Sequence, residues 1–439
     1  MQANDRKKRV TTVPAPSPLE PSGDPGKIGR RTFLARGAGM AAATATAWAA
    51  PTAAAADAPG VVQPWMRTPG RPMSTYGQPS AFEKPVGRIV LSPYGAIAPG
   101  VGAARTPIHA LEGTITPSGL HFERHHNGIP EIDPAAHRLL IHGLVEKPLA
   151  FTMQALLRYP MTSRTYFIEC AGNSSPNTNL KAPQLPAGAI HGMLSCSEWT
   201  GVPLAVLLKE AGVDPRAHWL LAEGADGAAM SRSVPLVKAL DDAMIAVYQN
   251  GERLRPEQGY PVRLLLPGWE GNMSVKWLHR LKLTEGPTHT KDETSKYSEP
   301  MADGKARQFT FEMGVKSVIT RPSGGMKMQG PGLHEIAGLA WSGAGKIRRV
   351  DVSLDGGTSW REAKLQDPIF SKSLTRFRLP WEWNGAPVQL QSRAIDEKGN
   401  VQPTRASWLA EYMPEQRYHN NSIQTWSVNT NGEINNVYL

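Results

Sequence analysis

Residues 167–175 read Phe-Ile-Glu-Cys-Ala-Gly-Asn-Ser-Ser, and the interpretation of the whole chain depends on this stretch. The apolar pair at 167–168 predicts a strand, so Cys170 should lie where that strand opens into a loop. The small residues after the thiol allow backbone to approach a ligand closely. Three interpretations of Cys170 stay open on this evidence: an inert buried thiol, a nucleophile with a distant histidine base, or a ligand.

Short strands and short helices alternate around this stretch, from about residue 106 to 288. Apolar runs predict buried strands, and a capping Thr or an initial Pro followed by a late Gly or Pro predicts helices. The expected strands are 139–141 and 262–266, and the expected helices are 152–157, ended by Pro160, and 203–210, ended by Gly212.

After about residue 305 the pattern changes to alternation of apolar and polar residues. Segments 350–354, 377–379 and 388–390 have a period of two, and Gly-containing turns follow at 355–357 and 397–400. Short alternating strands with spaced turns predict an antiparallel β-sandwich over 305–412. The polar segment 413–439 is expected to be a C-terminal tail held by Trp426 and Tyr438.

The N-terminal 105 residues are expected to comprise an export signal and an extended arm that lies on a domain surface. Arg30-Arg31, a weakly apolar Ala-rich stretch and Ala54-Ala55-Ala56 together predict a twin-arginine export signal at 1–56, which would carry a folded protein to the periplasm. A buried Ala-rich helix is the alternative, disfavoured by Pro51. Residues 57–105 are rich in Pro and Gly and predict an extended arm.

Composition excludes several classes of protein. The chain has 439 residues, a net charge of +10 and two cysteines, Cys170 and Cys196. Two cysteines cannot form a disulfide scaffold or a four-thiolate cluster, and no Cys-x-x-Cys-His motif for covalent haem is present. No apolar run is long enough to span a bilayer. Residues 1–56 contain 8 basic and 3 acidic side chains, so the remainder carries only +5. That excess does not indicate nucleic-acid binding.

Two further segments contain clustered cations. Residues 121–126 read His-Phe-Glu-Arg-His-His, which favours an anion site on a loop over a helical zinc site or a solvated surface loop. Arg263 begins an expected strand, and Lys276 follows a Gly-containing turn. Together these two cations are candidates for holding a phosphate.

Taken together, these motifs resemble the sulfite oxidase family of molybdopterin enzymes. The resemblance rests on Cys-Ala-Gly-Asn at 170–173, Trp-x-Gly-Val-x-Leu at 199–204, Gly-Tyr-Pro-Val-Arg at 259–263 and Ser-Val-Lys-Trp-Leu at 274–278. It implies an α+β protein, with a mixed α/β molybdopterin-binding catalytic domain at 106–304 followed by an immunoglobulin-like dimerisation domain at 305–412. Segments 190–192, 196–201, 291–297 and 423–426 are similar to a subgroup formed by the molybdenum subunits of sulfane dehydrogenases.

The resemblance also implies roles for individual residues. Cys170 would be the thiolate ligand of molybdenum, and Arg124 and Tyr297 would act on the substrate. Asp226 would accept hydrogen bonds from the pterin. The remaining cofactor-binding positions are Arg124, His125, His126, Gln258, Arg263, Ser274, Val275 and Lys276. Cys196 has no family role and is expected to be a structural buried thiol.

Two departures bear on the substrate. The family usually has Arg-Arg after the Asn of the Cys motif, where this chain has Ser174-Ser175. One cation of the sulfite pocket is therefore missing, and a wider mouth suits sulfane sulfur on a carrier protein better than free sulfite, the alternative substrate. Gln258 stands where vertebrate-type members carry His. Because this chain has no haem motif, a c-type cytochrome subunit is the expected electron acceptor, in a heterotetramer built on a homodimer.

Overall fold

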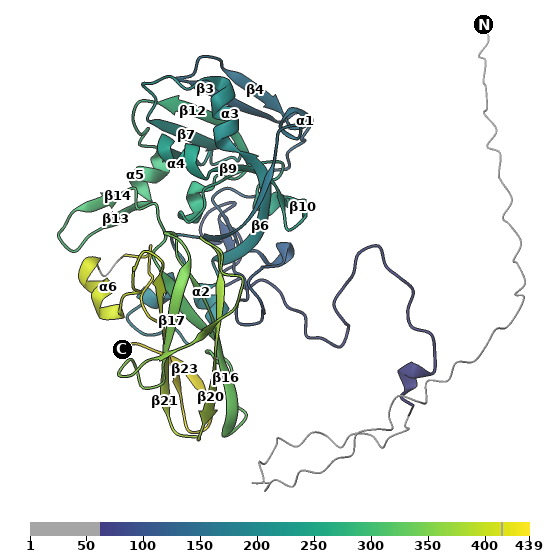
Figure 1. Cartoon of the computed structure of the whole chain (residues 1–439), viewed down its shortest axis with the longest axis vertical. Helices are drawn as coiled ribbons and strands as arrows, with labels where there is room; N and C mark the ends of the chain where they lie inside the picture. The colour runs from purple at the N-terminus through teal and green to yellow at the C-terminus, as the bar shows by residue number, and fades with distance from the viewer. Residues whose placement is uncertain (1–61, 414–415) are drawn as a thin grey trace, which may run out of the picture. The chain divides into compact units, whose positions relative to one another are not determined.

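The computed structural model of the chain describes residues 62–413 and 416–439, and the expected export signal at 1–56 lies outside them. The chain divides into two units, residues 1–78 and 79–439. In the described part of the first unit, one 3-10 helix, η1 (Pro64–Met66), begins at a proline (Figure 1). Everything that follows concerns the second unit.

Two five-stranded sheets form the first half of this unit. Only β3 and β12 pair in parallel among the named strands of these two sheets, and the other pairs are antiparallel. The first sheet has the order β10 (Glu252–Arg253), β9 (Met244–Gln249), β6 (Leu194–Pro203) and β5 (Thr162–Glu169), with β11 (Arg263–Leu265) also on β9. The second has the order β4 (Leu149–Thr152), β3 (Arg138–Gly143), β12 (Leu278–Thr284), β7 (Trp219–Gly224) and β8 (Ser231–Pro235).

Short helices connect these strands, with capping as expected. Thr152 accepts a hydrogen bond from the backbone N–H of Ala155, and Pro203 precedes a helix that ends at Gly212 with φ of 68°. The expected strands at 139–141 and 262–266 are also present. The helices are α1 (Met153–Leu156), α2 (Ala187–His191), α3 (Leu204–Ala211), α4 (Leu236–Asp241), α5 (Lys291–Ser295) and α6 (Arg405–Glu411), with 3-10 turns η2 (Ser118–Leu120), η3 (Ser175–Thr178), η4 (Pro256–Gln258) and η5 (Gly271–Met273).

The second half is an antiparallel β-sandwich (Figure 1). One sheet has the order β15 (Lys316–Arg321), β16 (Gly332–Trp341), β20 (Thr375–Trp383) and β19 (Lys364–Leu365). The other has the order β18 (Arg361–Glu362), β17 (Ile347–Ser353), β21 (Val388–Asp396), β22 (Thr425–Val428) and β23 (Ile434–Val437). The segment expected to be a tail therefore supplies the last two strands. Its Trp426 is fully buried, so hydrophobic burial holds it in the sheet.

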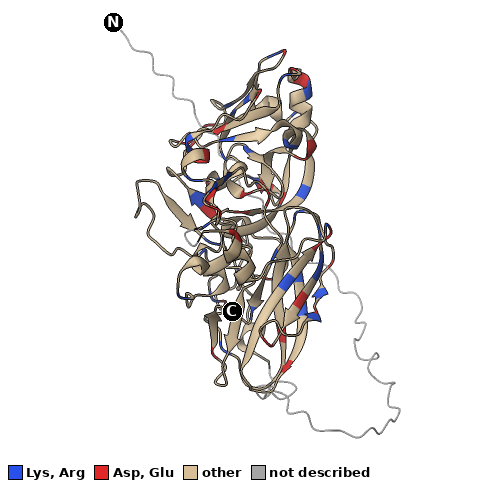
Figure 2. Cartoon of the chain, turned by 90° about the vertical axis from the view of Figure 1, so that its left-hand side faces the viewer, with Lys and Arg blue, Asp and Glu red and all other residues tan. Residues whose placement is uncertain are grey.

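One hydrophobic cluster spans the two halves, and the first half also has a core of its own. Phe167 and Cys196 of the first half belong to the same buried cluster as Trp341 and Trp426 of the sandwich. Two small ribbons complete the fold: β1 (Gly102–Ala104) with β2 (Glu123–His125), and β13 (Ser298–Pro300) with β14 (Ala306–Gln308). Figure 2 shows cationic and anionic residues interspersed in both halves. No helix within the described ranges is long and apolar enough to cross a bilayer.

Candidate functional site

Cys170 directly follows β5, where the strand opens into a loop as expected. The loop is held by backbone hydrogen bonds, because Cys170 N–H donates to Met193 O at 3.0 Å and its carbonyl accepts from Asn173 N–H at 2.8 Å. Burial raises the pKa of the Cys170 thiol, while the nearby charge of Arg124 lowers it. A cation beside the thiol favours the thiolate, which is the form that binds metal.

A cavity opens beside this thiol, and the empty space there amounts to about 690 Å³ when the open solvent at its mouth is included. All eleven residues expected to serve the site line it, although they come from seven separate segments of the chain. Their placement at one cavity is observed, while the role of each stays a prediction. The eleven are Arg124, His125, His126, Cys170, Asp226, Gln258, Arg263, Ser274, Val275, Lys276 and Tyr297.

Two buried cations form one wall of the cavity. Arg263 donates to the carbonyls of Gln258 at 3.1 Å and Ser274 at 2.8 Å, and Lys276 Nζ donates to the carbonyl of Glu257 at 3.0 Å. Neither has a carboxylate within 4.0 Å in the described part of the chain. Burial lowers the pKa of Arg263 to about 9, and burial also lowers the pKa of Lys276 well below its usual value. Buried charge without a counter-ion is costly, so this wall is suited to an anion such as a phosphate.

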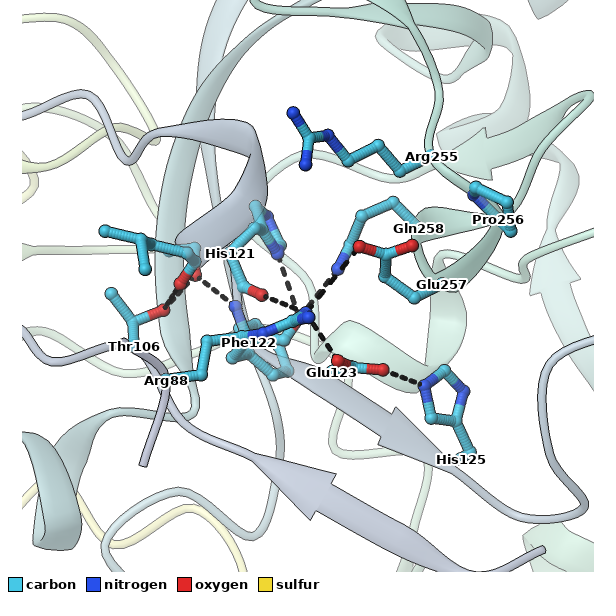
Figure 3. Close-up of polar contacts among 12 residues, drawn as sticks. Arg88, Thr106, His121, Phe122, Glu123, His125, Arg255, Pro256, Glu257 and Gln258 are labelled. Carbon is cyan, nitrogen blue, oxygen red and sulfur yellow. Dashed lines mark hydrogen bonds and ion pairs between the residues drawn. The ribbon is translucent and has the colours of Figure 1, made fainter. Parts of the chain in front are cut away.

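A chain of polar contacts leads to Lys276, and Figure 3 shows its Arg88, Glu123 and His125 members. His125 lies between Lys276 Nζ, 2.9 Å from its Nδ1, and Glu123 Oε2, 2.6 Å from its Nε2. Glu123 in turn pairs with Arg88 of the N-terminal arm at 2.5 Å. Since an ammonium group donates to Nδ1, Nε2 carries the proton and donates to Glu123. Residues 123–125 form strand β2, so His121 and His125 do not lie on one face of a helix as a helical zinc site would require.

Tyr297 faces the same cavity from the segment after α5. Its hydroxyl lies 3.2 Å from His126 Nε2, and the Arg232 guanidinium lies 4.7 Å from the centre of its ring. Arg232 is itself fixed by Glu270, at 3.0 Å, and by Glu293, at 3.5 Å. The capping box between Thr290 and Glu293 starts α5 and so sets where Tyr297 lies.

The remaining polar groups are oriented by backbone contacts. Asp226 accepts from Met230 N–H at 3.1 Å, Ser274 Oγ accepts from Leu266 N–H at 3.0 Å, and Gln258 Nε2 donates to the carbonyl of Phe122 at 2.9 Å. Gln258 therefore still makes a structural hydrogen bond where vertebrate-type family members have His. Asp226 is 8% exposed and keeps a second carboxylate oxygen for a ligand.

The donor set fits a molybdenum cofactor. A single thiol, that of Cys170, faces the cavity, and no group of three or more His, Cys, Asp or Glu residues that could bind a metal occurs among residues 62–413 and 416–439. A soft metal that enters with its own sulfur ligands needs only one protein thiolate. Arg263 Nε is buried and has no hydrogen-bond partner in those same ranges, which leaves a donor for a phosphate. The other thiol, Cys196, is buried 3.3 Å from Ser373 Oγ, and burial raises its pKa to about 11.

Several residues around the cavity were not expected from the sequence. Glu123, Asn272 and Trp277 line it, and Trp277 packs against the Lys276 ammonium at 4.4 Å. Glu123 and Trp277 directly adjoin predicted site residues in the sequence, and this adjacency could have predicted that they line the cavity. The structure also brings Tyr418 and His419, from the expected tail, against the Cys170 loop, and no local pattern marks them.

Comparison with known proteins identifies both halves. Residues 126–291 match the model of the oxidoreductase molybdopterin-binding domain, and residues 307–426 match the molybdenum-cofactor oxidoreductase dimerisation domain. Chicken sulfite oxidase is 31% identical over 326 residues, covering 68% of this chain and 71% of that protein. NADH nitrate reductase of Ulva prolifera is 31% identical over 346 residues, covering 69% of this chain and 40% of that protein.

A solved structure is more similar still. A chain in the crystal structure of sulfane dehydrogenase SoxCD from Paracoccus pantotrophus is 48% identical, with a TM-score of 0.83, and the match covers 86% of this chain and 97% of that one. The chain spans between 37% and 58% of the length of the first curated relatives.

Proposed function

Because the chain belongs to the sulfite oxidase family of molybdopterin oxidoreductases, we propose that it is the molybdenum subunit of a sulfane dehydrogenase, similar to SoxC. Its substrate is sulfane sulfur bound to a carrier protein. In each turnover one oxygen atom from water joins the sulfur, two protons are released, and two electrons leave one at a time for a c-type cytochrome resembling SoxD.

One observation carries the choice of substrate: the charge around Cys170. Arg124 is the strongest cationic influence on the thiol, Arg105 also interacts with it, and two carboxylates, Glu169 and Glu270, oppose them. Ser174 and Ser175 stand where the family has two arginines. Sulfite is a small, strongly hydrated anion that needs several cations to replace its water. A less cationic site suits a sulfur chain attached to a protein.

The protein's own residues bind and orient in this proposal. Cys170 ligates the metal, Asp226 and Gln258 orient the pterin, and the wall of Arg263 and Lys276 with Ser274, Val275, His125 and His126 holds its phosphate end. When bound, the cofactor supplies oxygen-atom transfer and stores the electron pair. Arg124 attracts the substrate's negative charge. The Tyr297 phenol donates a hydrogen bond to the oxygen being transferred, and its contact with His126 and Arg232 keeps it in place.

The proposal extends to partners and location. The dimerisation domain supports a homodimer, and the two-part name SoxCD supports a second subunit, which in this proposal is the c-type cytochrome of a heterotetramer. The predicted twin-arginine signal supports export of the folded, cofactor-loaded subunit to the periplasm. The domain boundaries that we propose are those predicted from the sequence, at 106–304, 305–412 and 413–439. The last of these segments supplies two strands of the sandwich.

A second candidate, oxidation of free sulfite, is favoured by the sulfite oxidases among the relatives and by Arg124. Metal analysis of the purified protein and parallel assays with sulfite and with a cysteine-bound sulfane separate the two. We expect one molybdenum per chain and higher kcat/KM for the sulfane. Protein without molybdenum would refute both candidates and favour an anion-binding adaptor, whereas higher kcat/KM for sulfite would favour the second candidate.

A further inference from the structure

The C-terminal segment 416–424, expected to be part of a polar tail, is attached directly to the Cys170 loop. His419 N–H donates to the carbonyl of Ala171 at 2.8 Å, and His419 Nε2 lies 3.4 Å from Glu270 and 3.3 Å from Glu299. Trp408 Nε1 donates to the His419 carbonyl at 3.2 Å. These buried contacts fix the backbone of the segment beside the metal-ligand candidate, so the residue before His419 has a defined position.

That residue is Tyr418, and its ring lies beside Tyr297, one of the residues that line the cavity. The ring stacks on Tyr297, with centroids 5.6 Å apart and planes inclined by 30°. It also covers Gly172, since a Cβ built on that glycine would lie 3.6 Å from Tyr418 Cε1. Tyr418 is not among the residues that line the cavity, but it stacks on Tyr297, which does line it, and lies against Gly172, two residues after Cys170; its side chain remains half-exposed.

The electrostatic surroundings of Tyr418 are those of the reacting site. Burial raises the pKa of the Tyr418 phenol, the charge of Cys170 raises it further, and Arg124 lowers it. Its hydroxyl makes no hydrogen bond to any residue in the described ranges. A structural hydrogen bond of the hydroxyl therefore does not account for a tyrosine at this position.

We propose that Tyr418 is a specificity-determining residue, which with Tyr297 forms an aromatic wall against which the sulfur-bearing arm of the substrate lies. This inference rests on the function proposed above and names what distinguishes its substrate. A divalent sulfur chain is polarisable and packs favourably against aromatic rings. The sulfite anion is small and hydrated, and it gains nothing comparable from such a wall.

The test compares two substrates on one enzyme. Holoenzyme is assayed with an artificial one-electron acceptor, using either sulfite or a synthetic peptide whose single cysteine carries one sulfane sulfur. Tyr418→Leu and Tyr418→Ala should lower the ratio of kcat/KM for the peptide to that for sulfite by about 2- to 10-fold, the size of a lost sulfur–aromatic contact. Tyr418→Phe should keep the wild-type ratio.

The controls separate a local effect from general damage. Tyr438→Ala removes another half-exposed tyrosine of the expected tail, whose hydroxyl donates a hydrogen bond to the Asn179 carbonyl. This variant should leave the ratio unchanged. Structural damage lowers both activities together and does not move the ratio. Should Tyr418→Ala lose molybdenum, Tyr418→Leu decides, because it preserves most of the volume.

Two outcomes overturn the inference in distinguishable ways. The inference about Tyr418 fails, and the proposed function stands, if the leucine variant holds molybdenum and keeps the wild-type ratio. The same holds if the phenylalanine variant lowers the ratio as much as the leucine variant does. A wild-type protein that holds molybdenum and oxidises only sulfite overturns the proposed function, and this inference with it.

Discussion

Lys316→Met should destabilise the protein through the loop that carries Cys170. Lys316 and Glu169 are each 1% exposed, and Lys316 Nζ lies 3.6 Å from Glu169 Oε1. The ammonium also donates to Ser174 Oγ at 2.6 Å and to the Asn420 carbonyl at 2.5 Å. It therefore joins the sandwich, the Cys170 loop and the C-terminal segment at one buried point.

The magnitude follows from what the substitution leaves behind. Glu169 keeps hydrogen bonds from Asn173 at 2.8 Å and Trp341 at 2.6 Å but loses its counter-ion. Removing one partner of a buried ion pair costs about 3–5 kcal/mol, because the other charge stays buried and unpaired. The double variant Glu169→Gln/Lys316→Met removes both charges of this pair. Its loss of unfolding free energy should therefore be smaller than the sum of the losses in the two single variants, by about 2 kcal/mol or more.

Denaturant unfolding followed by tryptophan fluorescence measures these free energies, with Lys305→Met as the matched control. Lys305 pairs with Asp303 at 3.6 Å, but its side chain is 82% exposed, so this variant should change stability by about 1 kcal/mol at most. A Lys316→Met variant as stable as Lys305→Met, or strict additivity in the double variant, would refute the reasoning.

Three further predictions follow from the site. Cys170→Ser should abolish turnover and molybdenum binding by metal analysis, and near-normal activity with molybdenum bound would contradict the ligand assignment. Ser175→Arg should raise sulfite oxidation relative to oxidation of carrier-bound sulfane, because it restores a cation, five residues after Cys170, at a position where the family has arginine; an unchanged ratio of kcat/KM values would count against the charge argument. Burial lowers the pKa of His419, but its contacts with Glu270 and Glu299 outweigh this and raise it. Protonated His419 therefore contributes stability below about pH 6.5 that is lost as the pH rises through its folded pKa, at up to about 1.4 kcal/mol per pH unit. The difference in unfolding free energy between wild type and His419→Gln, measured from pH 6 to 9, should shrink, and a constant difference would exclude this titration.

Short sequence patterns predicted most helices and strands correctly, because the contacts that begin and end these elements lie within a few residues of one another. The Thr152 cap, the Pro203 start and the Gly212 end of helices are each satisfied within a few residues. The alternation at 350–354 and 388–390 reflects which face of each strand is buried. The segment 425–437 was missed as a pair of strands because its polar residues obscure the period, although Trp426 is buried in the core.

By itself the sequence determined that a lone thiol opens a loop after a strand, that cations stand on two other segments, and which family motif they compose. Tertiary structure alone decided that Lys316, Tyr418 and His419 join them. Each acts across more than 140 positions of sequence from the Cys170 loop, through burial and hydrogen bonds that form only when both halves are folded together. Such contacts leave no periodicity or spacing in the chain, because their geometry belongs to the packed elements rather than to neighbouring residues.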